Sequence, residues 1–299
     1  MTLTLLSDLY DVSNRLVLKK DAVANFEVLH KIMEHGKRLK KVYIRFGDTP
    51  LSKDFKNIFN EEKYFTIFTP IRTNEEIITV VNNIKITTEI LEELKNIRDT
   101  LPYTFRHTLL VTALTVKIAL DLKSTEYDPE LIAVVGLTHD IGKTRVPKYI
   151  LGKDSPLRQS EYNLLMTHSL ISYILLCYYL GGSSNEILNA VRDHHEKLDG
   201  KGYPRGIKKI GKYAKIITPV DIFDALISER PYRSSPFTIR QALDYLIDEA
   251  NADRVDKEAV YYLISYVRKE HPNPEELKPY EKRTSLSRAD SYYGKVVPD

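Results

Sequence analysis

From residue 101 to residue 270, nearly every apolar run in this chain repeats with the period of a helix. Polar turns rich in Gly, Pro and Asp separate these runs, which fall at 109–122, 131–138, 161–179, 186–193, 211–228 and 238–250. Apolar side chains three and four positions apart share one face of a helix, and that face must be buried against other helices. The pattern therefore predicts an all-α domain at 101–270.

The first 72 residues have a different pattern. A helical repeat at 23–36 ends at Gly36, and it is surrounded by β-branched and aromatic runs that predict strands at 3–10, 15–19, 42–46 and 64–68. A polar turn between the first two runs predicts that those strands pair. The predicted fold class is mainly α, an all-helical bundle preceded by a small α/β module.

We predict four parts for the chain: the α/β module, for which regulation is one interpretation (1–72), a connecting helix (73–100), the helical domain (101–270) and a polar, Pro-containing tail (271–299). The connecting helix has apolar or β-branched residues at heptad positions, namely Ile77, Val80, Ile84, Thr87, Leu91 and Leu94. Two interpretations remain open: a homodimer seam, or a linker helix packed on its own chain.

The amino-acid composition excludes several classes of protein. The 44 basic and 41 acidic residues leave a formal charge of +3, too close to balance for a protein that binds duplex nucleic acid or a membrane surface generally. Cys177 is the single cysteine, which excludes an intramolecular disulfide and suits a reducing compartment. We expect no membrane span and no secretory signal, hence a cytoplasmic protein.

Five of the eight histidines lie between positions 107 and 195, and two of them are adjacent. With two aspartates they form a candidate ligand set at or near the ends of separate helical segments: His107, His139, Asp140, His168, His194, His195 and Asp221. Any one of these histidines alone is better explained as a core or surface residue. Together they predict side chains that converge inside a helical bundle to hold metal.

Imidazole and carboxylate ligands without thiolate favour iron or manganese over structural zinc. Seven ligands exceed what one ion needs, so we predict two divalent ions bridged by Asp140. Two such ions lower the pKa of a shared water, and the resulting hydroxide can attack a phosphoester.

Other residues suit a phosphate substrate. Lys143 follows His139 by one helical turn, and a Gly-rich loop at 199–206 carries Tyr203 for base stacking. Arg230 and Arg233 follow the last ligand segment and match phosphate or guanine edges, although an Arg held by a nearby carboxylate as a helix cap is an equal alternative.

These residues resemble the HD-GYP subgroup of the HD-domain phosphohydrolases. The resemblance runs through Thr138-His139-Asp140-Ile141-Gly142-Lys143, His168, His194-His195-Glu196, Asp199-Gly200-Lys201-Gly202-Tyr203-Pro204, Asp221-Ile222-Phe223-Asp224-Ala225-Leu226 and Arg230-Pro231-Tyr232-Arg233. It implies a bacterial phosphodiesterase that opens cyclic di-GMP to linear pGpG and onward to GMP in some members.

The resemblance also implies roles for the individual residues. One metal would bind to His107, His139, Asp140 and Asp221, and the other to His168, His194 and His195, with Asp140 bridging. Lys143 and Asp224 would flank the attacking hydroxide, and the nucleotide would contact Tyr203, Arg230 and Arg233. Some members bind a third metal through a Glu at the position of Tyr103, so two metals are expected here.

Two rival functions remain. One is hydrolysis of another cyclic dinucleotide or a nucleotide monophosphate, because metal ligands define the reaction better than the base. The other is a module that binds nucleotides or signalling proteins without turnover. The complete ligand set argues against the second, since such a module could lose ligands and keep its fold.

Overall fold

The structure, a computed structural model, describes residues 5, 7–69, 71–182, 184–229, 235–268, 270–277 and 297–299. Its α-helices are α1 (Phe26–Arg38), α2 (Phe55–Phe59), α3 (Ile71–Asn83), α4 (Thr88–Thr100), α5 (Pro102–Asp121), α6 (Pro129–Thr138), α7 (Lys148–Leu151), α8 (Gln159–Met166), α9 (His168–Leu180), α10 (Asn185–Asp193), α11 (Lys212–Ile227), α12 (Ile239–Asn251) and α13 (Lys257–Val267). The 3-10 helices are η1 (Phe46–Asp48), η2 (Pro50–Asp54), η3 (Glu62–Tyr64), η4 (Ile141–Arg145) and η5 (Pro274–Glu276). The protein is mainly helical, as the apolar period predicted.

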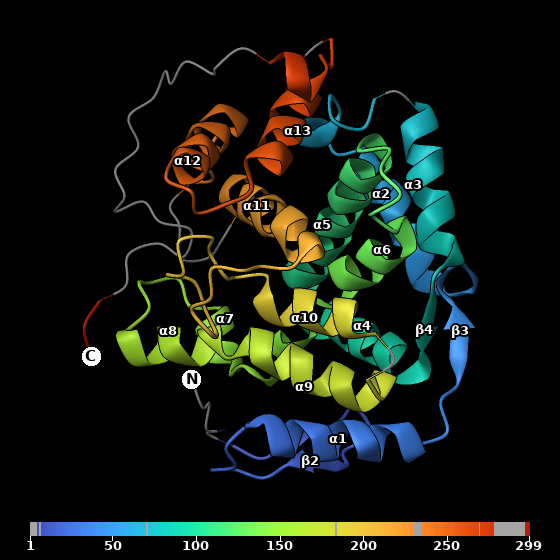
Figure 1. Ribbon diagram of the computed structural model, residues 1–299, viewed down its shortest axis with the longest axis vertical. Helices are drawn as coiled ribbons and strands as arrows, with labels where there is room; N and C mark the ends of the chain where they lie inside the picture. The colour runs from blue at the N-terminus through green and yellow to red at the C-terminus, as the bar shows by residue number, and fades with distance from the viewer. Residues whose placement is uncertain are drawn as a thin grey trace.

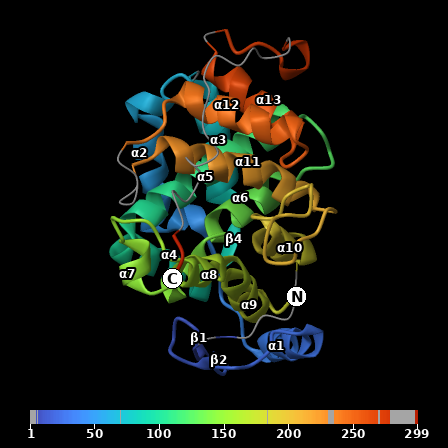
Figure 2. The ribbon, with the colours of Figure 1, turned by 90° about the vertical axis from the view of Figure 1, so that its left-hand side faces the viewer.

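The helices α5 and α6 lie side by side at the centre of the molecule (Figure 1). Both are apolar around most of their circumference and are buried along most of their length, as expected of helices enclosed by others. On one side, α9 packs between α10 and the N-terminal α1. On the other, α11 leads to α12 and α13 at the opposite end of the molecule (Figure 2).

Four short strands form two antiparallel sheets: β1 (Leu9–Tyr10) with β2 (Leu16–Leu18), and β3 (Tyr43–Arg45) with β4 (Lys85–Thr87). Leu9 lies opposite Leu18 in the first sheet, which confirms the predicted pairing, although among the described residues of 3–10 only Leu9 and Tyr10 form a strand. In the second, Ile44 lies opposite Ile86. This confirms the strand predicted at 42–46, and its partner comes from the segment predicted as a connecting helix.

The single helix predicted at 73–100 is wrong. The segment contains α3, then β4, then α4. The break falls in the β-branched stretch around Ile86 and Thr87, which pairs with β3, and the Thr87 side chain accepts a hydrogen bond from the Ile90 backbone N–H as the N-cap of α4. Strand pairing and a new helix cap therefore outweigh the helical period.

The heptad stripe is part of the protein's own core. Five of its six members are buried inside the described part of the chain: Ile77, Ile84, Thr87, Leu91 and Leu94. A seam between two copies needs these side chains exposed on the monomer, so their burial does not support the interpretation of this stripe as a homodimer seam. The alternative, packing on the same chain, is confirmed.

The strand predicted at 64–68 is wrong as well. Tyr64 ends η3, and the residues after it form turns. Tyr64, Ile67 and Phe68 are buried, whereas the Phe65 side chain is 64% exposed. Burial at positions i, i+3 and i+4 is the spacing of a helical turn, not the alternation of a strand.

One apolar core includes side chains from Leu5 to Tyr266, so the N-terminal segment packs directly against the helical bundle. The division into 1–72, 73–100, 101–270 and 271–299 stays a prediction, and most of the tail lies outside the described residues. Among the described residues, the stretch Gln159–Leu180 has the length and apolarity of a membrane span, and 78% of its apolar window is buried inside the protein.

Glu93 on α4 connects the N-terminal hairpin to η4. Its buried carboxylate accepts two hydrogen bonds from the Arg145 guanidinium, both at 2.6 Å, and one from the Tyr179 hydroxyl at 2.6 Å. Arg145 also donates to the Tyr10 carbonyl at 3.1 Å, and the Tyr179 hydroxyl accepts from the Val12 N–H at 3.1 Å. This network holds η4 in place.

We expect Glu93→Gln to destabilise the protein by about 3 kcal/mol, because the Arg145 charge loses its partner in a largely buried site. Glu92→Gln is the matched control: its carboxylate is half-exposed and pairs with Lys95 across one helical turn. Urea unfolding should move to a lower midpoint for the first variant only. Equal midpoints for the two would mean that the Glu93 network does not stabilise the fold.

Candidate metal centre

The structure brings all seven predicted metal ligands together in the bundle interior. Five separate elements deliver them, and each side chain is buried: α5 carries His107, the end of α6 is followed by His139 and Asp140, α9 begins at His168, α10 is followed by His194 and His195, and α11 carries Asp221. They form two groups, His168 with His194 and His195, and His107 with His139 and Asp221. Within each group the candidate ligand atoms lie within 4.8 Å of one another.

Gly142 lets the two groups approach. A Cβ at this position would lie 2.2 Å from the backbone oxygen of His168 and 2.7 Å from the backbone N of Ser172. Only glycine permits this contact between η4 and the start of α9. The Gly142 N–H also donates to the Ser172 hydroxyl at 2.8 Å, which fixes Asp140 beside His168.

Three of the histidines have their tautomer set by the backbone. Nδ1 of His139, His168 and His194 lies 2.6–2.7 Å from the carbonyl oxygen three residues earlier. A carbonyl can only accept, so each Nδ1 carries the proton and each Nε2 presents its lone pair to the site. This is the arrangement that histidine metal ligands need.

Asp140 has one oxygen toward each group. Its Oδ1 lies 3.3 Å from His168 Nε2, and its Oδ2 lies 3.4 Å from His139 Nε2 and 3.8 Å from His107 Nε2. The predicted bridge between two ions requires this orientation.

The donor set fits bound cations. Among the described residues, His139 Nε2 and Asp140 Oδ1 are buried without a hydrogen-bond partner. His168 Nε2 and His194 Nε2, both lone-pair nitrogens, face each other at 3.4 Å. Buried acceptors that face one another repel unless a positive charge lies between them. Two buried His/Asp groups therefore fit a binuclear metal site.

Burial sets the protonation of the first group. It lowers the pKa of His168 to about 3 and that of His194 to about 4, and it also lowers the pKa of His195. These imidazoles are neutral at pH 7, the form that binds metal.

The pKa of His107 changes in the other direction. Burial acts to lower it, but hydrogen bonds with Asp221 and Asp224 outweigh burial and raise it. His107 Nε2 lies 3.0 Å from Asp221 Oδ1. The two carboxylates that favour a proton on His107 also attract a metal cation.

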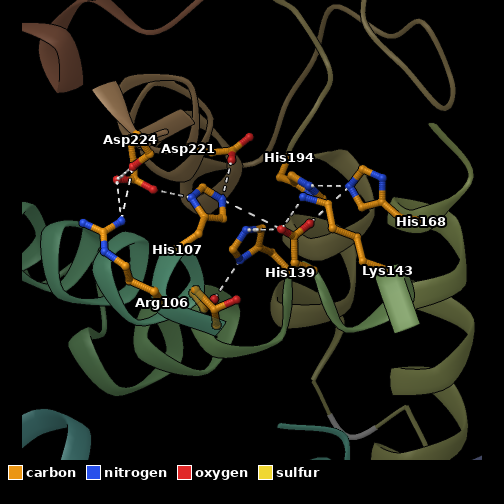
Figure 3. Close-up of polar contacts among 12 residues, drawn as sticks. Arg106, His107, His139, Lys143, His168, His194, Asp221 and Asp224 are labelled. Atoms are coloured by element: carbon orange, nitrogen blue, oxygen red, sulfur yellow. Dashed lines mark hydrogen bonds and ion pairs between the residues drawn. The ribbon is translucent and has the colours of Figure 1, made fainter. Parts of the chain in front are cut away.

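Lys143 lies where the sequence predicted it. Its ammonium group donates to Asp140 Oδ2 at 2.6 Å, and the side chain is almost completely buried. It therefore places a positive charge at the edge of the candidate centre. Figure 3 shows Lys143 with His168 and His194 on one side of the site.

Asp224 lies elsewhere than expected. It is behind His107, on the side of Arg106 (Figure 3), and its Oδ2 accepts from His107 Nδ1 at 2.5 Å. Its Oδ1 accepts from the hydroxyls of Tyr64 and Ser228. Both oxygens of Asp224 therefore accept hydrogen bonds on the side away from Asp140. This position suits a residue that orients His107. It differs from the expected position beside the attacking hydroxide.

Tyr203 covers the first group. Its ring stacks on His195 with centroids 4.6 Å apart and an interplanar angle of 27°. Glu196 shapes the loop after Tyr203, because its buried carboxylate accepts three backbone N–H bonds, from Arg205, Gly206 and Ile207. Arg205 pairs with Asp193 at 2.6 Å, so its positive charge helps to hold the loop in place. Arg230 and Arg233 lie outside the described residues.

Two residues beside this centre escaped the sequence analysis. Tyr64 donates to Asp224, and Arg106 lies against Tyr64 and Asp224. Arg106 precedes a predicted ligand, which is a weak signal. Tyr64 gives no local signal, because it meets Asp224 across 160 positions of sequence.

The comparisons with known proteins agree with the motifs. A family model described as HD domain matches residues 90–259. The chain is 34% identical over 164 residues to the 3'3'-cGAMP-specific phosphodiesterase 1 of Vibrio cholerae, covering 54% of this chain and 37% of the relative. It is 37% identical over 136 residues to the cyclic di-GMP phosphodiesterase response regulator RpfG of Xanthomonas campestris, covering 43% of this chain and 34% of the relative.

The matched region thus spans little more than a third of these relatives' own lengths. Among solved structures, an HDG"Y"P protein from Bdellovibrio bacteriovorus aligns with a TM-score of 0.46 and 16% identity, covering 88% of this chain and 97% of that chain.

Proposed function

Because this chain belongs to the HD-domain family and has the motifs of its HD-GYP subgroup, we propose that it is a metal-dependent phosphodiesterase that hydrolyses cyclic di-GMP to linear pGpG. The orientation of Asp140, with one oxygen toward each buried histidine group, carries the proposal. A carboxylate held between two ligand groups is what a two-metal phosphoesterase needs. Further cleavage of pGpG to GMP is the second step to test.

We assign the residues as the resemblance implies, with one change. His107, His139 and Asp221 would hold one ion and His168, His194 and His195 the other, with Asp140 between them. Iron or manganese suits these ligands and, when bound, would lower the pKa of a shared water and neutralise phosphate charge. The change concerns Asp224, which orients His107 and so does not contact the phosphate.

Side chains near the candidate centre can bind the phosphate and the bases of the substrate. The Lys143 ammonium adds a positive charge beside Asp140, where a phosphate oxygen can bind. Tyr203 offers an aromatic face at the rim for a base, and Arg230 and Arg233 are proposed nucleotide contacts. We further propose a cytoplasmic location, which suits a signalling dinucleotide, and signalling proteins as partners of the loop at 199–206.

A second substrate has its own support. The Vibrio cholerae relative, at 34% identity, is named for 3'3'-cGAMP. The two dinucleotides differ in one base, so metal ligands do not distinguish them. Contacts to the base edges would decide between them, and the proposed contacts Arg230 and Arg233 are candidates for that choice.

We expect manganese-loaded or anaerobically iron-loaded protein to convert cyclic di-GMP to pGpG. Chromatography of the products measures this conversion. Parallel reactions with 3'3'-cGAMP and pGpG measure base preference and the second cleavage. Faster turnover of 3'3'-cGAMP would replace the proposed substrate. A protein with both metals bound that cleaves neither dinucleotide would refute the phosphodiesterase and favour a binding module.

A further inference from the structure

Asp224 is buried at the centre of a hydrogen-bond network that ends at His107. Its Oδ2 accepts from His107 Nδ1 at 2.5 Å, and its Oδ1 accepts from Ser228 Oγ at 2.8 Å and from the Tyr64 hydroxyl. The side chain is fully buried. Because a carboxylate has only two oxygens, the donors on Oδ1 determine how Oδ2 is presented to the His107 ring.

Tyr64 is held firmly in this position. Its ring is fully buried, and the Arg106 guanidinium lies over it, 5.6 Å from the ring centroid. Arg106 Nε donates to Glu61 Oε1 at 2.8 Å, so the segment that carries Tyr64 is joined to α5 one residue before His107. The same segment contributes the buried Ile67 and Phe68 to the core. The phenol is therefore fixed relative to α5 by charge and by packing.

Tyr64 comes from outside the region matched by the HD-domain model, which starts at residue 90. We propose that Tyr64 is a positioning residue for the metal centre, acting through Asp224 on His107. It orients the Asp224 carboxylate, which in turn holds the His107 ring with Nε2 toward Asp221. The N-terminal segment is thus part of the centre, beyond any regulatory role. This inference rests on the proposed metal site but not on the proposed substrate.

The test variant is Tyr64→Phe, which keeps the ring and removes only the hydroxyl. The matched control is Tyr266→Phe: this tyrosine is also buried and donates to an aspartate of α5, Asp121, at 2.7 Å. Asp121 lies 14 positions after His107 on α5, about 20 Å along the helix. Both variants lose one hydroxyl-to-carboxylate bond, so both should lose similar stability in urea unfolding.

Metal affinity distinguishes a positioning role of Tyr64 from a merely structural one. Titration of metal-free protein with Mn²⁺, followed by electron paramagnetic resonance, should show one of two sites weakened about tenfold or more in Tyr64→Phe and neither in Tyr266→Phe. In an Asp224→Asn background, Tyr64→Phe should have no further effect, because the two residues act in series. Wild-type affinity in Tyr64→Phe, or equal losses in both tyrosine variants, would overturn the proposal.

The titration uses no nucleotide, so the two proposals can fail separately. Wild-type protein that binds two Mn²⁺ but cleaves no dinucleotide would refute the proposed function and leave this inference standing. If Tyr64→Phe were recovered unfolded, Ser228→Ala would provide the second readout, since Ser228 donates to the same oxygen. An Asp224-dependent loss of Mn²⁺ affinity in Ser228→Ala supports positioning through Oδ1, and wild-type affinity overturns it.

Discussion

Replacing Asp140 with alanine should remove both bound metals and lower phosphodiester hydrolysis by about 10³-fold or more. Asp140 is the side chain with an oxygen toward each histidine group, at 3.3 Å from His168 and 3.4 Å from His139. Without it, each site loses a ligand and the two sites lose their bridge. The loss of several kcal/mol of charge stabilisation in the transition state, at about 1.4 kcal/mol per tenfold, gives this magnitude.

Elemental analysis of anaerobically purified protein and product chromatography measure the two effects together. Asp154→Ala is a suitable control, because Asp154 is exposed and lies outside the two ligand groups. The control should keep two metals and full turnover. An Asp140→Ala variant that retained both metals would show that the bridging assignment is wrong, even if it were inactive.

Replacing Lys143 with methionine should lower kcat by about 10²-fold while both metals remain bound. Methionine keeps much of the length of the side chain and removes the charge, which lies 2.6 Å from Asp140 Oδ2. Removing one donor that stabilises developing negative charge typically lowers kcat by about 10²–10³-fold. Substrate binding should change less than kcat, because the stabilisation is largest in the transition state.

Steady-state kinetics with metal content measured on the same samples tests this. Lys148→Met, at an exposed position on α7, is the control and should leave kcat unchanged. If Lys143 only neutralised Asp140 before metal binding, Lys143→Met would bind metal at least as tightly and keep its kcat. That result would remove Lys143 from the catalytic assignment.

The candidate ligand set could be proposed from the sequence because metal chemistry restricts residue types. Histidine supplies the imidazole nitrogen ligands and aspartate can supply carboxylate oxygens, and here these residues occur in adjacent pairs such as His139-Asp140 and His194-His195. The structure brings all seven together. Helical period likewise predicted the bundle, since each helix buries one face wherever its neighbours lie.

The errors have a common cause. The period across Ile84 to Leu94 is real, yet the chain forms β4 at Ile86 because β3 is available to pair with it. The aromatic run after Tyr64 has strand propensity, yet it turns so that Tyr64 and Phe68 both enter the core. Partners distant in sequence decide such cases, and local propensity does not contain them.

The sequence by itself determined the helical class, the family and the candidate metal-ligand set, because each depends on residue type and short spacing. Only the tertiary structure decided that Asp224 lies on the Nδ1 side of His107. It also decided that Tyr64, from the N-terminal segment, contacts Asp224. Those contacts join side chains far apart along the chain. Their geometry depends on how α5, α11 and the segment around η3 pack, which no local pattern encodes.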